Sequence, residues 1–131
     1  MSWVSVLAAF LVAHMVGDYL LQTDWQARNK RCGLGGDRVA LRALLTHVTT
    51  YTLAFVPALI WIANELDPAW AIVSAVLIFL PHLVIDDGRM VALYMTRVKR
   101  ANGFEAGLAA SVDQTFHILS LFLVALLVGS A

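Results

Sequence analysis

The sequence has few cysteines, few charged residues and no excess of charge of either sign, and each shortage excludes a class of protein. Cys32 is the only cysteine, so an intrachain disulfide and a metal site built from several cysteines are both excluded. Nine basic and nine acidic residues cancel, so the net charge indicates no nucleic-acid partner. Lys and Arg are missing before the first apolar run, which therefore does not resemble a cleaved signal peptide.

Apolar residues are what the sequence has in abundance. They make up 60% of the 131 residues, and the mean hydropathy is +0.77, whereas an average soluble domain is roughly 45–50% apolar. Four segments are long enough to cross about 30 Å of hydrocarbon, at about 3–22, 39–63, 69–95 and 106–128. We therefore predict an all-α polytopic membrane protein, with one transmembrane domain over 1–131 that is an antiparallel bundle of four transmembrane helices.

The third segment is interrupted by the polar sequence Asp86-Asp87-Gly88-Arg89. Two structures are compatible with this sequence. The helix either continues through it to Met95, or ends at Gly88 and is followed by an interfacial helix. We favour the continuous helix.

The connections between the segments differ in charge. The first and third contain nearly all of the Lys and Arg residues, whereas the second, 64–68, contains only acids. The positive-inside rule therefore predicts that both basic connections are cytoplasmic and both termini are outside. Trp3, Trp61 and Trp70 would lie near the outer interface and Trp25 near the inner one, as expected for tryptophan.

Each segment contains one histidine, and three of the segments also contain an aspartate four residues from it. The pairs are His14 and Asp18, His82 and Asp86, and Asp113 and His117, and the fourth histidine is His47. Residues four apart stack on one face of a helix. Counted from the cytoplasmic ends, the carboxylates form one layer and the imidazoles the next. The order is reversed in the fourth segment, which runs opposite to the first and third.

These pairs have two interpretations. Each could be a local salt bridge within its own helix. Ionisable groups at bilayer depth cost at least ~2.5–3.5 kcal/mol each, however, and are rare there without a function. Three pairs and a further histidine at one depth therefore favour a shared site between the helices.

The residue types predict a site for a divalent metal, with zinc as the first choice. Imidazole nitrogen and carboxylate oxygen are ligands of zinc and of harder first-row ions. The predicted ligands are His14, Asp18, His47, His82, Asp86, Asp113 and His117. One or two ions could bind, and two ions ~3.5–4 Å apart would suit hydrolysis of a phosphoester or pyrophosphate. The candidates for acid–base catalysis are Asp18, Asp86 and Asp113.

Other polar residues are expected around this site. Four could support the ligands by hydrogen bonds, or only hold helices together: Gln22, Tyr51, Asp87 and Gln114. Asp87 points about 100° away from Asp86 and could instead pair with a basic residue. Four basic residues toward the cytoplasmic mouth could bind anionic head groups, or could simply be the positive-inside signal: Arg28, Lys30, Arg42 and Arg89.

These residues favour a metal-dependent hydrolase that acts on a lipid-linked or phosphate-ester substrate, with membrane lipid as its partner. Asp and His at bilayer depth also form proton relays and ion pathways, so a proton- or metal-ion-conducting transporter or channel subunit is the alternative. With four helices per chain, a carrier would require a homo-oligomer. A structural membrane subunit is the third interpretation, although small residues hold helices together at lower cost.

Four motifs carry a resemblance to a known family. They are His14-x-x-Gly17-Asp18-Tyr19-x-x-Gln22-x-x-Trp25-x-Ala27-x-x-Lys30, His47 with Tyr51, His82 through Asp86, and Asp113-Gln114-x-x-His117. Over essentially its whole length the sequence resembles small bacterial membrane proteins grouped as domain-of-unknown-function family 3307. The resemblance implies a multi-pass protein of the bacterial inner membrane, or a phage or mobile-element copy of one, and it implies no established activity.

Overall fold

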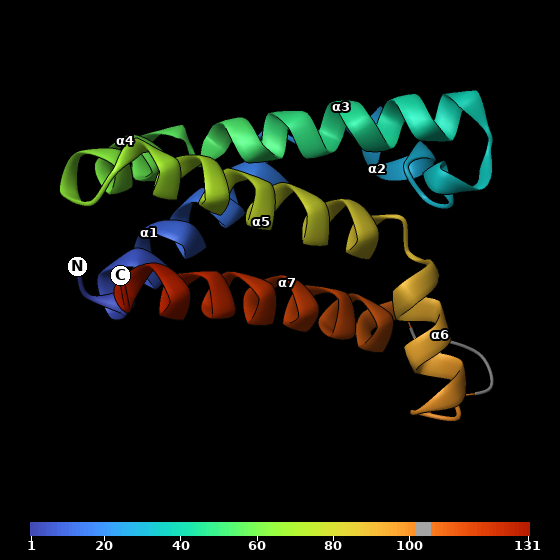
Figure 1. The fold of residues 1–131 in the computed structure, drawn as a ribbon. Helices are drawn as coiled ribbons and strands as arrows, with labels where there is room; N and C mark the ends of the chain where they lie inside the picture. The colour runs from blue at the N-terminus through green and yellow to red at the C-terminus, as the bar shows by residue number, and fades with distance from the viewer. Residues whose placement is uncertain (102–105) are drawn as a thin grey trace.

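The structure, a computed structural model, describes residues 1–101 and 106–131, and these residues form helices and their connections (Figure 1). The elements in chain order are α1 (Trp3–Met15), the π-helical turn η1 (Val16–Leu20), α2 (Asp24–Asn29), the 3-10 turn η2 (Gly33–Gly35), α3 (Arg38–Ala54), α4 (Val56–Glu65), α5 (Pro68–Asp86), α6 (Arg89–Arg97) and α7 (Ala106–Gly129). The predicted all-α class is confirmed for this part of the chain.

Three helical segments are long and apolar enough to cross a membrane: Trp3–Leu20, α5, and α7 from Gly107. The pair α3 and α4 also passes this test as one bent unit, which makes up to four. Large apolar side chains cover the outside of these helices. Leu20 is 76% exposed and Val12 and Ile72 are each 67% exposed, as expected for surfaces that face lipid.

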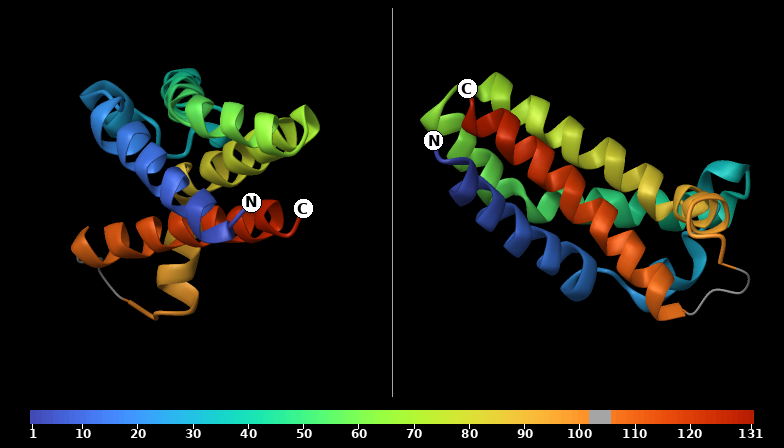
Figure 2. Two further views of the ribbon diagram at one scale, coloured as in Figure 1. Left: turned by 90° about the vertical axis from the view of Figure 1, so that its left-hand side faces the viewer. Right: turned by 90° about the horizontal axis from the view of Figure 1, so that it is seen from below.

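Both termini lie at the same end of the molecule, beside the turn between α4 and α5 (Figures 1 and 2). There α1 packs closely on α7. A Cβ atom added to Gly129 of α7 would lie only 2.5 Å from the Cβ atom of Trp3 in α1, so the absence of a side chain at Gly129 permits this contact. The helix α5 packs against α3, α4 and α7. The short elements α2, η2 and α6 lie at the opposite end (Figure 1).

The predicted second segment, 39–63, consists of two helices rather than one. The axis bends by 48° between α3 and α4, at Phe55. Pro57 explains the bend, since it has no N–H to donate to the carbonyl group one turn earlier and its ring crowds that carbonyl.

The prediction of a continuous third helix, 69–95, is wrong. α5 ends at Asp86, and Gly88 adopts a left-handed conformation with φ of 81°, which favours glycine and ends the helix. α6 then leaves the long helices at a steep angle (Figure 1). Its buried side chains, Val91 and Met95, pack with Ile85.

The apolar core lies in the half of the molecule that contains the termini. Phe10 and Phe55 pack edge to face at its centre, with ring centroids 5.6 Å apart, and both are fully buried. The other fully buried apolar side chains of this core are Val6, Ile62 and Ala125. The other half, which we call the polar half, buries histidine and aspartate side chains beside the smaller apolar cluster of Ile85, Val91 and Met95.

Candidate metal centre

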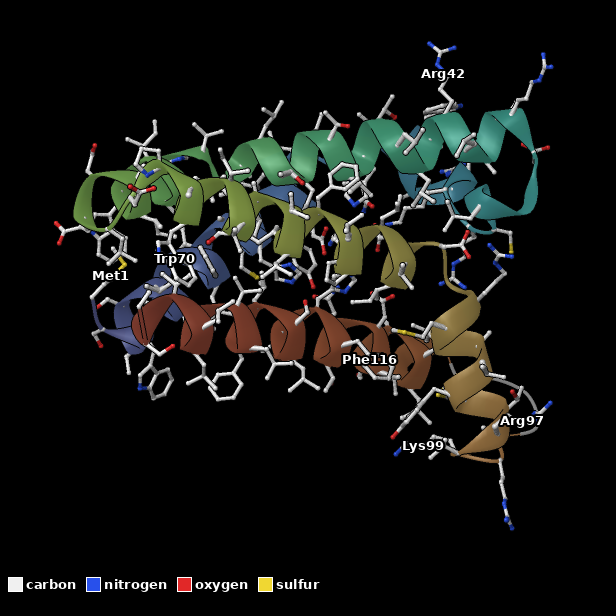
Figure 3. All side chains as sticks on the ribbon, in the orientation of Figure 1. Met1, Arg42, Trp70, Arg97, Lys99 and Phe116 are labelled. Atoms are coloured by element: carbon white, nitrogen blue, oxygen red, sulfur yellow. The ribbon has the colours of Figure 1, made fainter. Side chains whose placement is uncertain are left out.

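All four histidines are buried in the polar half, and each comes from a different long helix. His14 of α1, His47 of α3, His82 of α5 and His117 of α7 are at most 2% exposed. Nitrogen and oxygen atoms gather between these helices in Figure 3. The histidines therefore share one interior region, as the depth argument predicts.

The π-helical turn η1 places Asp18 in this region. The turn widens the helix after α1, and Gly17 lies against α3, where a Cβ atom would come within 2.6 Å of Tyr51 Cδ2. Only glycine permits this approach. π-Helical turns within α-helices are frequent at functional sites. The turn was not predicted from the sequence, although Gly17 directly before Asp18, in an otherwise apolar segment, is a signal for it.

Four ligand atoms converge from η1, α3 and α5. One each from Asp18, His47, His82 and Asp86 lie within 4.8 Å of one another. The two Nε2 atoms are 3.1 Å apart. Asp86 Oδ2 lies 2.8 Å from His47 Nε2 and 3.1 Å from His82 Nε2. Asp18 Oδ1 lies 3.3 Å and 3.5 Å from the same two nitrogens. We call these four residues the first ligand group.

These distances fit the donor set of a metal ion. Zinc binds imidazole nitrogen and carboxylate oxygen at about 2.0–2.2 Å, so two ligands of one tetrahedral ion lie about 3.3 Å apart. Hydrogen bonds explain the cluster less well. Among the described residues, Asp18 Oδ1 is fully buried and has no hydrogen-bond partner, although it lies near two imidazole nitrogens. Within the group, a hydrogen bond joins the two imidazoles, between His47 Nε2 and His82 Nε2.

A second ligand group adjoins the first and shares Asp86 with it. It consists of Asp86, Asp113 and His117. Asp86 Oδ1 lies 3.5 Å from His117 Nε2, while its Oδ2 belongs to the first group. The Nδ1 of His117 is 3.4 Å from Asp113 Oδ2 and 2.9 Å from the Asp113 carbonyl oxygen. A carboxylate shared in this way can bridge two ions.

His14 lies beside these groups and belongs to neither. Its Nε2 donates to Gln114 Oε1 at 2.9 Å, and its Nδ1 accepts from the Tyr51 hydroxyl at 3.0 Å. Nδ1 is 3.6 Å from Asp18 Oδ2. Both ring nitrogens therefore have protein partners, and no hydrogen bond joins the ring to Asp18, so this arrangement suits a residue that is fixed beside the ligand groups better than it suits a metal ligand.

Three of the four polar residues expected around the site lie beside His14 or Asp18. Tyr51 bonds to His14 and stacks on His82, with ring centroids 3.5 Å apart. Gln114 also bonds to His14. Gln22 donates to the backbone carbonyl of Asp18 at 3.3 Å.

Asp87 points away from both ligand groups. Its Oδ1 accepts from Leu34 N–H at 2.8 Å, its backbone carbonyl accepts from Cys32 N–H at 2.8 Å, and its Oδ2 accepts from Arg89 Nε at 2.5 Å. This carboxylate raises the pKa of the Arg89 guanidinium by hydrogen bonding. Asp87 therefore attaches the η2 turn and α6 to the end of α5.

The basic residues predicted to bind head groups have different partners. Arg28 pairs with Asp24 on the surface of α2, at 2.9 Å, and the Arg42 guanidinium lies 6.0 Å from the Trp25 ring centroid. Lys30 instead enters the site, where its Nζ donates to Asp86 Oδ2 at 2.6 Å. This contact was not predicted from the sequence, although Lys30 stands at the end of the longest motif.

A pocket of ≈ 290 Å³ leads from the end of the molecule that carries α2 and α6 to the ligand groups. Asp18, Asp86 and Asp113 line its inner part, and Lys30 and Arg31 are its basic residues. Small side chains form much of the remaining wall: Ala27, Gly88, Ala92, Ala109 and Ala110. The pocket gives a molecule of modest size access to both groups.

A protein-family model matches most of the chain. Residues 6–131 match a family model described as "Protein of unknown function (DUF3307)". No curated protein and no solved structure matches the chain, so the chemistry of the site is argued from its geometry. The match extends over nearly the whole chain and includes all four motifs, and the chain therefore belongs to the DUF3307 family.

Proposed function

We propose that the chain is a single transmembrane domain that crosses a bacterial inner membrane four times, as an antiparallel bundle of α1 with η1, the bent pair α3 and α4, α5, and α7. An even number of crossings returns the chain to its starting side, and both termini lie at one end (Figures 1 and 2). Membrane lipid then surrounds the exposed apolar side chains.

The end that carries α2 and α6 is the cytoplasmic one in this proposal. Arg42, Arg97 and Lys99 are at this end, whereas Trp70 lies at the other (Figure 3). The positive-inside rule and the preference of tryptophan for interfaces both support this orientation. The break at Gly88 allows α6 to lie along the cytoplasmic surface.

Within this bundle we propose a divalent metal site, with zinc as the first choice. The observation that carries the proposal is the convergence of Asp18, His47, His82 and Asp86 within 4.8 Å in a buried position. Asp86 could extend the site to a second ion held with Asp113 and His117. Metal in such a site would lower the pKa of a bound water.

The proposed reaction is hydrolysis of a phosphate ester on a lipid-linked substrate. If one ion is bound, Asp18 and Asp86 would hold it, and the Asp113 carboxylate, which is 28% exposed and lines the pocket, would be free to accept a proton from water. Lys30 and Arg31 supply positive charge for an anionic group. The exposed ring of Tyr19 at the pocket edge could contact an apolar tail.

One observation favours hydrolysis over ion transport. The pocket reaches the ligand groups from the cytoplasmic end, while Tyr51, Phe10 and Phe55 fill the interior on the other side and are at most 1% exposed. A transport path would have to pass through this packed region. A site that opens to one side suits an enzyme and does not suit an open channel.

The first test is metal analysis of protein purified in detergent without added metal. We expect stoichiometric metal in the wild type and its loss in His82→Ala and Asp18→Asn. Asp24→Asn is the matched control, because this carboxylate is exposed on α2 and should leave the metal unchanged. A metal-free wild type at every pH would contradict the proposal.

The second test separates a hydrolase from a carrier. The metal-loaded protein is reconstituted in sealed vesicles and supplied with bacterial lipid extract. Release of inorganic phosphate that disappears in Asp113→Asn is the expected result. Metal-ion or proton flux without phosphate release would instead establish a transporter.

A further inference from the structure

Lys30 reaches from the end of α2 into the polar interior. Its Nζ donates to Asp86 Oδ2 and to Gln22 Oε1, both at 2.6 Å, and its side chain is only 15% exposed. Its backbone is held in place, because Lys30 N–H donates to the carbonyl group of Gln26 at 3.0 Å. Gln26 is itself buried and donates to Thr46 of α3.

The oxygen that binds Lys30 is the one that the proposed metal site requires. Asp86 Oδ2 is also the oxygen that lies 2.8 Å from His47 Nε2 and 3.1 Å from His82 Nε2. An ammonium group and a divalent ion on one carboxylate oxygen would lie within roughly 4 Å of each other, where two buried positive charges repel strongly. The two cations therefore exclude each other from this oxygen.

We propose that Lys30 and the divalent metal compete for Asp86 Oδ2. Without metal, Lys30 neutralises this buried carboxylate. When metal binds, the flexible side chain of Lys30 turns into the adjoining pocket, which it lines together with Arg31. There its ammonium group binds the phosphate group of a ligand. This inference rests on the proposed metal site and assigns Lys30 as the residue that couples metal binding to anion binding.

The competition is tested by the affinity of the metal-free protein for Zn²⁺ alone, measured against a chromogenic chelator. Lys30→Met should bind Zn²⁺ at least about tenfold more tightly than the wild type, because the competing charge is removed. Lys30→Arg keeps the charge and should show no such gain. Lys99→Met is the matched control, since Lys99 is exposed at the tip of the α6 segment and should leave the affinity unchanged (Figure 3).

The outcomes distinguish this inference from the proposed function. Equal or weaker Zn²⁺ binding by folded Lys30→Met, with Zn²⁺ still bound by the wild type, overturns the competition and leaves the metal site standing. Absence of Zn²⁺ binding in all four proteins overturns both. Circular dichroism of each variant checks that its helices are intact.

The anion role of Lys30 is tested with inorganic phosphate as the probe. Binding of phosphate to the Zn²⁺-loaded protein is measured calorimetrically. Lys30→Met should weaken this binding about tenfold, and Lys30→Arg should retain it, because either cation can contact phosphate. Phosphate binding that is equal in wild type and Lys30→Met would overturn this role.

Discussion

The two halves of the helix assembly have interiors of opposite chemistry. In the half next to the termini, Phe10, Phe55 and Ile62 are fully buried among other apolar side chains. In the other half, the same helices bury four imidazoles and the carboxylates of Asp18 and Asp86. The change takes place within single helices, since Phe10 and His14 are one turn apart in α1.

This difference indicates what each half contributes. Lipid tails are as apolar as leucine, so between membrane helices the apolar half is stabilised chiefly by close packing. The polar half is costly to bury, because ionisable groups lose their hydration. A protein that only needed four packed helices would have no reason to keep it. We therefore expect function in the polar half and helix packing in the apolar half.

The largest expected effect comes from Asp86→Asn. This change removes a charged ligand that both ligand groups share, so metal affinity should fall by more than about 100-fold, beyond the loss typical of residues that only orient ligands. The neighbouring Asp87→Asn is the control, because Asp87 points to the η2 turn and should leave metal affinity within about twofold of the wild type. Competition with a chelator measures the metal affinity of both variants. Equal losses of affinity would contradict the assignment of Asp86, and not Asp87, as a metal ligand.

Phe10→Ala tests the apolar half. In water-soluble proteins a Phe→Ala change in a core costs about 3–5 kcal/mol. Because lipid removes much of the transfer contribution, we expect a loss of about 2 kcal/mol in the free energy of unfolding in detergent. Metal stoichiometry should stay at the wild-type value. Loss of metal at temperatures where the helices remain folded would show that the halves are not separable.

Tyr51→Phe tests the boundary between the halves. The variant keeps the ring that stacks on His82 and removes the hydroxyl that donates to His14. We expect metal affinity to fall about tenfold, because the His14 ring, which lies beside Asp18, is then held less firmly. His14→Gln should cause a similar loss. An effect of His14→Gln as large as that of Asp86→Asn would identify His14 as a ligand.

The smallest effect is expected from Val12→Ala. Val12 is 67% exposed on the outside of α1, two residues from His14. Such surface changes usually alter stability by less than about 0.5 kcal/mol. Both the thermal unfolding temperature and the metal content should match the wild type. A marked loss of either would indicate that this face contacts another copy of the chain.

Several features of the site were predictable from the sequence. The four-residue spacing places each aspartate within ion-pair distance of its histidine, at 3.6 Å for His14 and Asp18 and 3.1 Å for His82 and Asp86. Regular helix geometry in α5 sets the second distance, whereas the first also depends on the π-helical turn η1. The same geometry predicted that Asp87 would point about 100° away from Asp86. Of the two roles left open for Asp87, the structure shows pairing with a basic residue, Arg89.

Other features depended on contacts that local patterns do not encode. The end of α5 at Gly88 was mispredicted because the apolar pattern resumes immediately in α6. The π-helical turn at Asp18 requires the close approach of α3 at Gly17. The partner of Lys30 is 56 residues away, so its role could not be inferred from its position after α2.

The sequence by itself determined that the helices have apolar exteriors and that each carries a histidine at a similar depth, because hydropathy and a rise of 1.5 Å per residue are local properties. Only the tertiary structure decided which atoms meet. His47 and His82 are 35 residues apart and their Nε2 atoms are 3.1 Å apart, a contact that depends on how α3 and α5 rotate and pack. Rotating either helix by a single residue step, about 100°, would turn its histidine away from the site.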